Sequence, residues 1–472
     1  MADQLQAGVA KVDITPPLGL TMAGYGARTE VADGIEDPLY AHAIAFEQGD
    51  EACAIVVGDL IGLKREQSEM LRERVTELCG LPADRVMACA THTHWGPALS
   101  ASNYLSENLR DAVSQEYTQT CVNQMAGAVA EAWRLREPAV ALAGTGDADL
   151  VKFNRRPVNA QGNVEMNLRL PLDQALVASR VGAELADTWS EGGPHGERLS
   201  DILVEVQGLR VGPAPTHLPV LKLVRPDGSP IAAVIAFGCH PVCGAGREET
   251  FYRYSADWPG YARRVIERTL GCPALLLLGS AGDQVPLRRG GDSRRRIGHS
   301  VGAEALRVWE LIEDDGAGPL RVASRTVELP LREFPSVEEA QAALEATDDP
   351  EGTGAVHERH MLQMAEKHRG QRSLPVEVWS MALGDTWGLV GLPGEVLSEF
   401  ELQIRQQSSF ANTAVIELSL DSPGYLPTDG AIDEGGYESG WSPFGRGVEA
   451  AAVEGAVEAL AAVAQGRGKS EG

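Results

Sequence analysis

Two uninterrupted apolar runs constrain the fold of this chain most strongly. Residues 230–241 (PIAAVIAFGCHP) and 273–283 (PALLLLGSAGD) are apolar without alternation, and each ends abruptly in polar residues. Strands with one face in water alternate apolar and polar residues, whereas strands buried on both faces are apolar throughout. Residues 256–271 lie between the two runs and have a helical pattern. The order predicts a β-α-β unit with parallel strands, which is typical of an α/β fold.

The same alternation of strands and helices covers most of the chain. Strands are expected at 41–48, 53–60, 85–94 and 376–395, and helices at 64–80, which Gly80 ends, and at 447–465. A helical insertion at about 335–372 opens with a capping box from Ser336 to Glu339, and its His357 and His360 are expected on a solvated face. We therefore expect one large α/β domain over 1–472, with a mixed β-sheet flanked by helices and a disordered tail at about 466–472.

Charge and composition exclude several classes of partner. The 472 residues carry a formal net charge of −26, which disfavours nucleic acid and anionic membrane surfaces as partners. The longest apolar runs are too short to cross a bilayer, and the N-terminus has no basic region followed by an apolar stretch. We expect a cytoplasmic protein with a small-molecule substrate, seven reduced cysteines and an oligomeric state that the sequence leaves undetermined.

Polar residues suited to chemistry follow several of the predicted strands. His92, His94, His240, Asp283 and Glu395 all stand where an apolar run ends. Ligands bind at this edge of open α/β sheets, so the active site is expected at the strand C-terminal ends. Catalytic zinc takes three or four nitrogen or oxygen ligands, for which His92, His240 and Glu395 are candidates.

Each of these candidates also has a structural interpretation. A strand-end histidine is often a hydrogen-bonded core residue, and Glu395 could be a carboxylate at a helix N-terminus. A cysteine ligand from Cys239 or Cys243, which flank His240, is a further alternative. The residues by themselves leave a metal site and a set of separate structural residues both open.

A series of motifs resembles the neutral (non-lysosomal) ceramidase family. In order, the motifs are AKVDITPPLG, MAGYG, THTHWGP, FNRRP, FGCHP, GSAGDQVP, LPGE, GYLPT and GGYE, and they cover nearly the whole chain. The resemblance is to the N-terminal catalytic domain of that family. It implies one zinc ion, with His92, His240, Glu395 and Tyr425 as ligands. His94 would lie beside the metal, and Arg155 and Tyr437 would complete the catalytic set.

The resemblance also implies a role for each residue. Zinc lowers the pKa of bound water and polarises a carbonyl group. Tyr437 would share the negative charge that develops on the carbonyl oxygen, and His94 would carry a proton to the departing amine. Arg155 would hold a hydroxyl or carboxylate group near the scissile bond.

Two departures from the family pattern bear on the substrate. The family's G-D-V-S-P serine is replaced by Val285, and the chain ends one helix after GGYE, without the family's C-terminal β-sandwich domain or a secretion signal. We therefore expect a zinc-dependent hydrolase that cleaves the amide bond of a soluble, polar or anionic N-acyl compound. Cleavage of an ester or glycosidic bond on the same scaffold is the alternative, followed by a non-catalytic zinc-binding protein.

Overall fold

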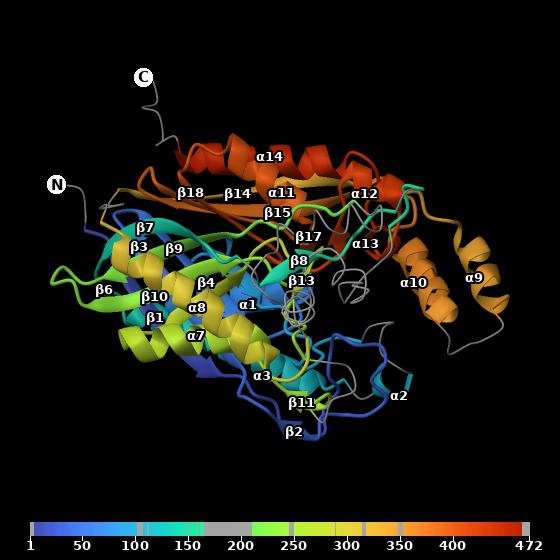
Figure 1. Cartoon of the computed structure of the whole chain (residues 1–472), viewed down its shortest axis with the longest axis horizontal. Helices are drawn as coiled ribbons and strands as arrows, with labels where there is room; N and C mark the ends of the chain where they lie inside the picture. Colours follow the sequence, from blue (N-terminus) through green and yellow to red (C-terminus); the bar gives the residue numbers. More distant parts are fainter. Residues whose placement is uncertain are drawn as a thin grey trace, which may run out of the picture.

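Three larger β-sheets, each with helices on its outer face, make up most of the chain (Figure 1). The computed structural model describes residues 4–101, 107–110, 113–149, 151–159, 161–164, 210–244, 250–287, 289–313, 318–347 and 353–464. Among these residues, no helix is long and apolar enough to cross a membrane.

The first sheet has the strand order β5-β4-β3-β1-β6. Its strands are β1 (Gln6–Asp13), β3 (Tyr40–Gln48), β4 (Glu51–Gly58), β5 (Val86–Ala90) and β6 (Glu137–Pro138). Strands β3 and β4 form the predicted hairpin, and β5 runs parallel to β4. Helices α1 (Arg65–Cys79) and α3 (Gln115–Arg134) cover its outer face. Gly80 ends α1 in the left-handed conformation, with φ 77°, as predicted.

The second sheet contains the β-α-β unit predicted from the apolar runs. Its order is β12-β10-β9-β7, with β7 (Val140–Asp147), β9 (His217–Val224), β10 (Pro230–Phe237) and β12 (Ala274–Leu278). Strands β10 and β12 pair in parallel, and α7 (Asp257–Leu270) connects them. Together with α8 (Ser293–Leu311), α7 covers the outer face.

The third sheet has the order β14-β15-β16-β18. Its strands are β14 (Leu320–Pro330), β15 (Ser373–Leu383), β16 (Trp387–Gly391) and β18 (Asn412–Ile416). Helices α11 (Ser398–Gln407) and α14 (Val448–Ala464) cover it. Strands β16 and β18 are parallel, so each of the three sheets contains one parallel pair.

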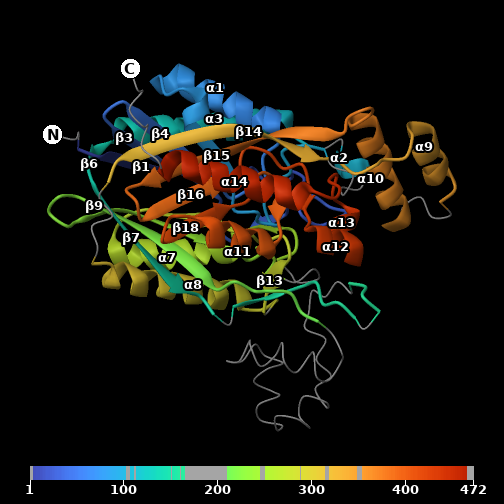
Figure 2. The ribbon, with the colours of Figure 1, turned by 90° about the horizontal axis from the view of Figure 1, so that it is seen from above.

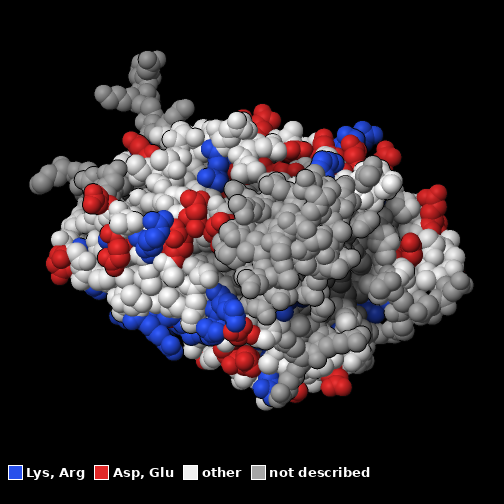
Figure 3. Space-filling model, viewed as in Figure 1, with Lys and Arg blue, Asp and Glu red and all other residues white. Residues whose placement is uncertain are grey.

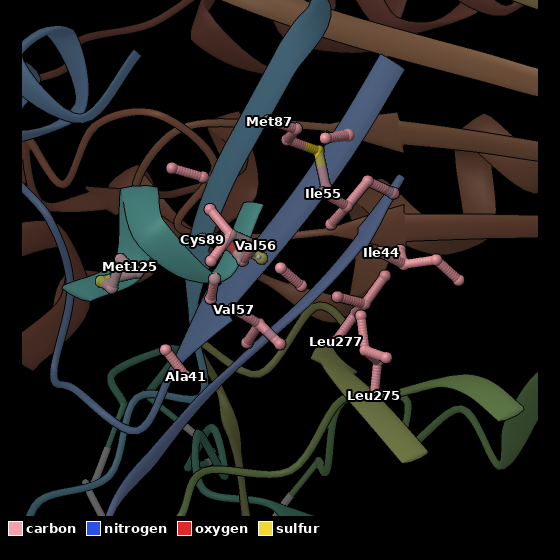
Figure 4. Close-up of a cluster of buried hydrophobic side chains, with 14 of the residues drawn as sticks. Ala41, Ile44, Ile55, Val56, Val57, Met87, Cys89, Met125, Leu275 and Leu277 are labelled. Carbon is pink, nitrogen blue, oxygen red and sulfur yellow. Dashed lines mark hydrogen bonds between the residues drawn. The ribbon is translucent and has the colours of Figure 1, made fainter. Parts of the chain in front are cut away.

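The inner faces of the three sheets pack against one another. Seen from above, α1 and α3 lie on one side, α7 and α8 on the opposite side, and the third sheet with α14 between them (Figure 2). Residues of β12 alternate between two cores: Leu275 and Leu277 point to the shared centre, and Leu276 and Leu278 point to the helices. Figure 4 shows Leu275 and Leu277 beside Ile44 of β3. This double burial explains why 273–278 is apolar without alternation.

Most of the remaining described elements are short. These elements are η1 (Ala83–Arg85), α2 (Glu107–Arg110), α9 (Val337–Glu345), α10 (Thr353–Lys367), α12 (Asp429–Glu434), α13 (Tyr437–Gly440) and the paired strands β2 (Gly34–Ile35) with β11 (Arg253–Tyr254), β8 (Lys152–Asn154) with β13 (Gln284–Pro286), and β17 (Glu395–Val396) with β19 (Tyr425–Leu426). Helices α9 and α10 lie at one end of the molecule (Figure 1). The capping box of Ser336 and Glu339 opens α9 as predicted.

The predicted mixed α/β class is confirmed, but its strands are divided among several sheets instead of one. That all of 1–472 forms one domain stays a prediction, and the predicted tail lies outside the described residues. On the face in Figure 3, acidic and basic side chains intermingle, and Lys and Arg gather over α7 and α8.

Candidate active site

The three sheets each bring one candidate metal ligand to the same point. His92 follows β5 of the first sheet, and His240 follows β10 of the second. Glu395 follows β16 of the third sheet and begins β17. The predicted placement at the carboxyl ends of strands therefore assembles these side chains from segments up to about three hundred residues apart in the chain.

The THTH segment is a tightly fixed loop. The hydroxyl of Thr91 donates to Asp59 Oδ1 at 3.2 Å, and that of Thr93 donates to the Ser255 carbonyl at 2.6 Å. With both threonines anchored in the protein, the intervening His92 turns the other way and has a φ of 62°. A non-glycine residue in this region is strained, and such strain is common at functional sites.

Three imidazole rings are each oriented by a hydrogen bond from their Nδ1 atom to a backbone carbonyl. Nδ1 of His92 lies 2.6 Å from the Ile61 carbonyl oxygen, Nδ1 of His94 lies 2.9 Å from that of Gly24, and Nδ1 of His240 lies 2.9 Å from that of Ala281. A carbonyl can only accept, so each Nδ1 carries the hydrogen, and in the neutral ring the lone pair is on Nε2.

The Nε2 atoms of these rings converge with the Glu395 carboxylate. His92 Nε2 lies 3.0 Å from His240 Nε2, 3.4 Å from His94 Nε2 and 3.3 Å from Glu395 Oε2. Glu395 Oε2 is buried and accepts no hydrogen bond from the described residues. Lone pairs packed this closely repel one another unless a cation lies among them. The donor set of imidazole nitrogens and a carboxylate oxygen fits zinc.

The surroundings favour the protonation states that bind a metal. Burial lowers the pKa of His240 and of His94 well below the ordinary value, and neighbouring cationic groups lower both further. Burial on its own would raise the pKa of Glu395, but His92, Tyr425 and Arg155 outweigh it, and the pKa is lowered. Neutral imidazoles and an ionised carboxylate are the ligand forms of these side chains.

Tyr425 reaches the same point through the short β17–β19 pair. Glu395 and Tyr425 are direct partners in this parallel pair. The Arg155 guanidinium donates to the Tyr425 hydroxyl oxygen at 3.1 Å, and it donates to Glu438 at 2.7 Å. A guanidinium at the phenolic oxygen stabilises negative charge on that oxygen, which suits a metal ligand.

Arg155 and its neighbour Arg156 are both paired with one buried carboxylate. Arg156 Nη1 donates to Glu438 Oε2 at 2.6 Å, while Arg155 Nε donates to Glu438 Oε1. Neither arginine is among the described residues that line the cleft over the candidate metal site. The pairing favours a positioning role for Arg155, behind Tyr425, over direct contact with a substrate anion.

The cleft has a volume of about 290 Å³ and contains the rest of the predicted catalytic set. His94 and Tyr437 line it, together with His92, Glu395 and Tyr425. The ring of Tyr437 lies 5.7 Å from that of Tyr425. The structure thus brings together the residues that the motifs suggested, with Arg155 one layer behind them.

Comparisons with known proteins bear on the family resemblance and the fold. Residues 5–168 match the family model described as neutral/alkaline non-lysosomal ceramidase, N-terminal. The fold matches a crystal structure of neutral ceramidase from Pseudomonas aeruginosa with a TM-score of 0.69 and 18% identity, covering 97% of this chain and 74% of that one. The chain has the neutral ceramidase fold. A ceramidase complexed with C2 matches over 97% of this chain and 75% of that one, with a TM-score of 0.68 and 17% identity.

These findings confirm the resemblance to neutral ceramidases inferred from the motifs. The matched sequence region and the fold support a ceramidase-like hydrolase, and a group of three histidines, His92, His94 and His240, is placed where it could hold a metal ion.

The position of the ceramidase-family serine has a structural role here. Val285 lies in β13, is fully buried and packs in the central core.

Cys239 and Cys243, which lie on either side of His240 in the sequence, are buried in the core under α7 and α8. Burial raises the pKa of both thiols. The three-histidine group found among the described residues does not include them.

Sequence reasoning missed two carboxylates that support the site. Glu438 directly follows Tyr437 in GGYE but was assigned no role. Glu417 follows the apolar strand β18, the same signal that marked His92 and Glu395, and its Oε2 accepts from the backbone N–H of Ala281 and of Val396. Glu417 thus braces the carbonyl that orients His240 and the residue next to Glu395.

Gly24 provides a local test of how His94 is oriented. Gly24 has a φ of 97°, and a Cβ there would lie 2.7 Å from the His94 side chain. We expect Gly24→Ala to displace His94. If His94 is catalytic, as the motifs predict, kcat should fall by about tenfold or more, since small misplacements of a catalytic group are costly. Steady-state kinetics would show this, with Gly19→Ala as the control, because Gly19 also has a positive φ but open space around it. Equal losses in both variants would assign the effect to backbone strain instead.

Proposed function

We propose that the chain is a zinc-dependent hydrolase that cleaves the amide bond of an N-acyl compound. The meeting of three imidazole Nε2 atoms with the buried Glu395 carboxylate, whose Oε2 lies 3.3 Å from His92 Nε2 and 3.6 Å from His240 Nε2, carries this proposal. His92, His240, Glu395 and Tyr425 would hold the ion. Zinc in such a site supplies a Lewis acid for a carbonyl oxygen and lowers the pKa of bound water.

His94 is the residue proposed to move protons. Its Nδ1 is held by the Gly24 carbonyl, so its Nε2 faces the cleft with a lone pair, 3.4 Å from His92 Nε2. From there it can take a proton from the attacking water and deliver it to the amine that leaves. An amine is a poor leaving group unless it is protonated, so this step is essential for amide cleavage.

Tyr437 is proposed to stabilise the oxygen of the substrate carbonyl. Its side chain lines the cleft beside Tyr425, on the short helix α13. A phenolic O–H can donate to the negative charge that develops when the carbonyl carbon is attacked. Glu438, the next residue, is fixed by Arg155 and Arg156 and so anchors α13 in place.

The bond type rests on the family match, since the two similar structures are ceramidases. Part of the cleft wall is apolar, with Ile61, Leu99 and Met364, and suits an acyl chain.

A panel of short-chain acyl anilides, aryl esters and aryl glycosides, each with and without a chelator, tests the proposal. We expect turnover of the anilides that the chelator abolishes. Turnover of the esters or the glycosides, but not of the anilides, would show that the enzyme cleaves an ester or a glycosidic bond instead of an amide. Turnover that persists with the chelator would contradict the role of the metal.

A further inference from the structure

Part of the cleft wall outside the proposed metal ligands is basic. Outside the proposed ligands, the charged residues among the described lining are Lys64, in the loop between β4 and α1, and Lys367, at the end of α10. In a chain with a net charge of −26, two lysines at one cleft wall indicate that this part of the cleft attracts a negatively charged group.

Lys64 is held in place by its own backbone and side chain. Its backbone N–H donates to Gln67 Oε1 at 2.9 Å in the capping box of α1, and its Nζ donates to the Ser422 carbonyl at 2.6 Å. Partial loss of hydration lowers the pKa of this ammonium, the nearby Asp421 and Glu395 carboxylates oppose that shift, and the like charge of Lys367 adds to it. The two positive charges are thus close enough to repel each other.

Asp421, the carboxylate that precedes Ser422 at this wall, is paired with another residue. Asp421 Oδ2 lies 3.3 Å from Arg65 Nε, and its Oδ1 accepts from the backbone N–H of Arg65 and of Ser422. Two of the three hydrogens on the Lys64 ammonium remain after the bond to Ser422, and the cleft is where they can be used.

Helix α10 contributes more than Lys367 to this wall. His360 and Met364 of the same helix line the cleft, and the His360 ring lies 4.5 Å from that of Trp441. Figure 1 shows α10 beside α13, which carries Tyr437. His357 and His360, which are expected on a solvated helix face, are both half-buried, and the rings of both contact Trp441.

We propose that Lys64 and Lys367 form an anion subsite that binds a carboxylate, or a group of similar charge, at the end of the substrate remote from the scissile amide. The inference rests on the proposed amide hydrolysis for its substrate class. The subsite, the apolar wall and the metal-proximal residues lie in one cleft, so one molecule with an anionic end, an apolar chain and an amide matches all three. This subsite takes the role of binding a carboxylate that the family resemblance implied for Arg155, whose guanidinium is paired with Glu438.

Monoanilides of succinic, adipic and suberic acid, each paired with its neutral methyl ester, test the subsite. The ratio of kcat/KM for acid over ester should exceed one at the chain length that spans the cleft. In the Lys64→Met, Lys367→Met double variant, this ratio should fall on the order of 10- to 100-fold, as expected for lost charge-assisted hydrogen bonds. Methionine keeps the length of the aliphatic stem. Lys11→Met, on β1 in a surface ion pair with Glu267, is the matched control and should keep the ratio.

Calorimetric binding of the same acids and esters to metal-free protein separates this inference from the proposed function. Binding that favours the acid and is lost in the double variant, without anilide turnover, would keep the subsite and reject amide hydrolysis. Turnover or binding with no preference for the acid, or a preference that survives in the double variant, would overturn the subsite.

Discussion

A variant with His92 and His240 both replaced by alanine should lose its bound zinc and all measurable turnover. The two imidazoles come from different sheets and meet at 3.0 Å, so removing them leaves only Glu395 and Tyr425 as proposed ligands. The rate should then fall by a factor of about 10⁶ or more, the lower end of the acceleration that enzymes provide. Elemental analysis of the purified variant, together with anilide turnover, measures both quantities.

The matched control for this double variant is His299→Ala. His299 lies on the exposed side of α8, away from the cleft, so its loss should change neither zinc content nor turnover. Thermal unfolding of metal-free samples would establish that the double variant is folded. Full retention of zinc in that variant would place the metal elsewhere in the chain and would refute the proposed ligand set.

The second large effect is expected for His94→Ala, which should keep its zinc while losing most of its turnover. A positioned general acid-base contributes a factor of about 10²–10⁴, so kcat for an anilide should fall within this range. The loss should be smaller for an activated aryl ester, because its leaving group departs without a proton. The comparison of anilide and ester within one variant therefore reports the proton transfer itself.

Zinc content decides between two roles for His94. Its Nε2 lies 3.4 Å from that of His92, near enough for His94 to belong to the metal site as well. If His94→Ala loses its zinc together with activity, His94 is a ligand and the proton carrier must be sought elsewhere in the cleft. Full turnover with full zinc would remove it from both roles.

Local pattern was sufficient to predict the apolar strands that lead to the site, the helices at 64–80, 256–271 and 447–465, and the edge at which the site lies. It did not predict β1, β7, β9, β14, α3 or α8. The runs at 230–241 and 273–283 were interpreted correctly as buried parallel strands, because burial on both faces leaves a direct mark on composition. The division of the strands among three sheets leaves no comparable pattern in the sequence. Each strand is apolar on the face that meets another sheet, whichever sheet that is, so the pattern alone cannot assign partners.

The same distinction applies to the candidate site. His92, His240 and Glu395 stood out because each ends an apolar run, and Tyr425 and Arg155 were found through motifs. The pairing of Arg155 and Arg156 with Glu438 joins segments more than two hundred residues apart, and Lys64 and Lys367, which line one cleft, are as far apart in the sequence. Spacing along the chain carries no information on such contacts, and the side of α10 that faces Trp441 depends on tertiary packing in the same way.

Titration of metal-free protein with zinc, followed by anilide turnover, tests the central proposal most directly. If His92, His240, Glu395 and Tyr425 form one catalytic site, activity should rise in proportion to added zinc and level off at about one ion per chain. Activity in the metal-free protein equal to that of the zinc-loaded protein would contradict the proposal.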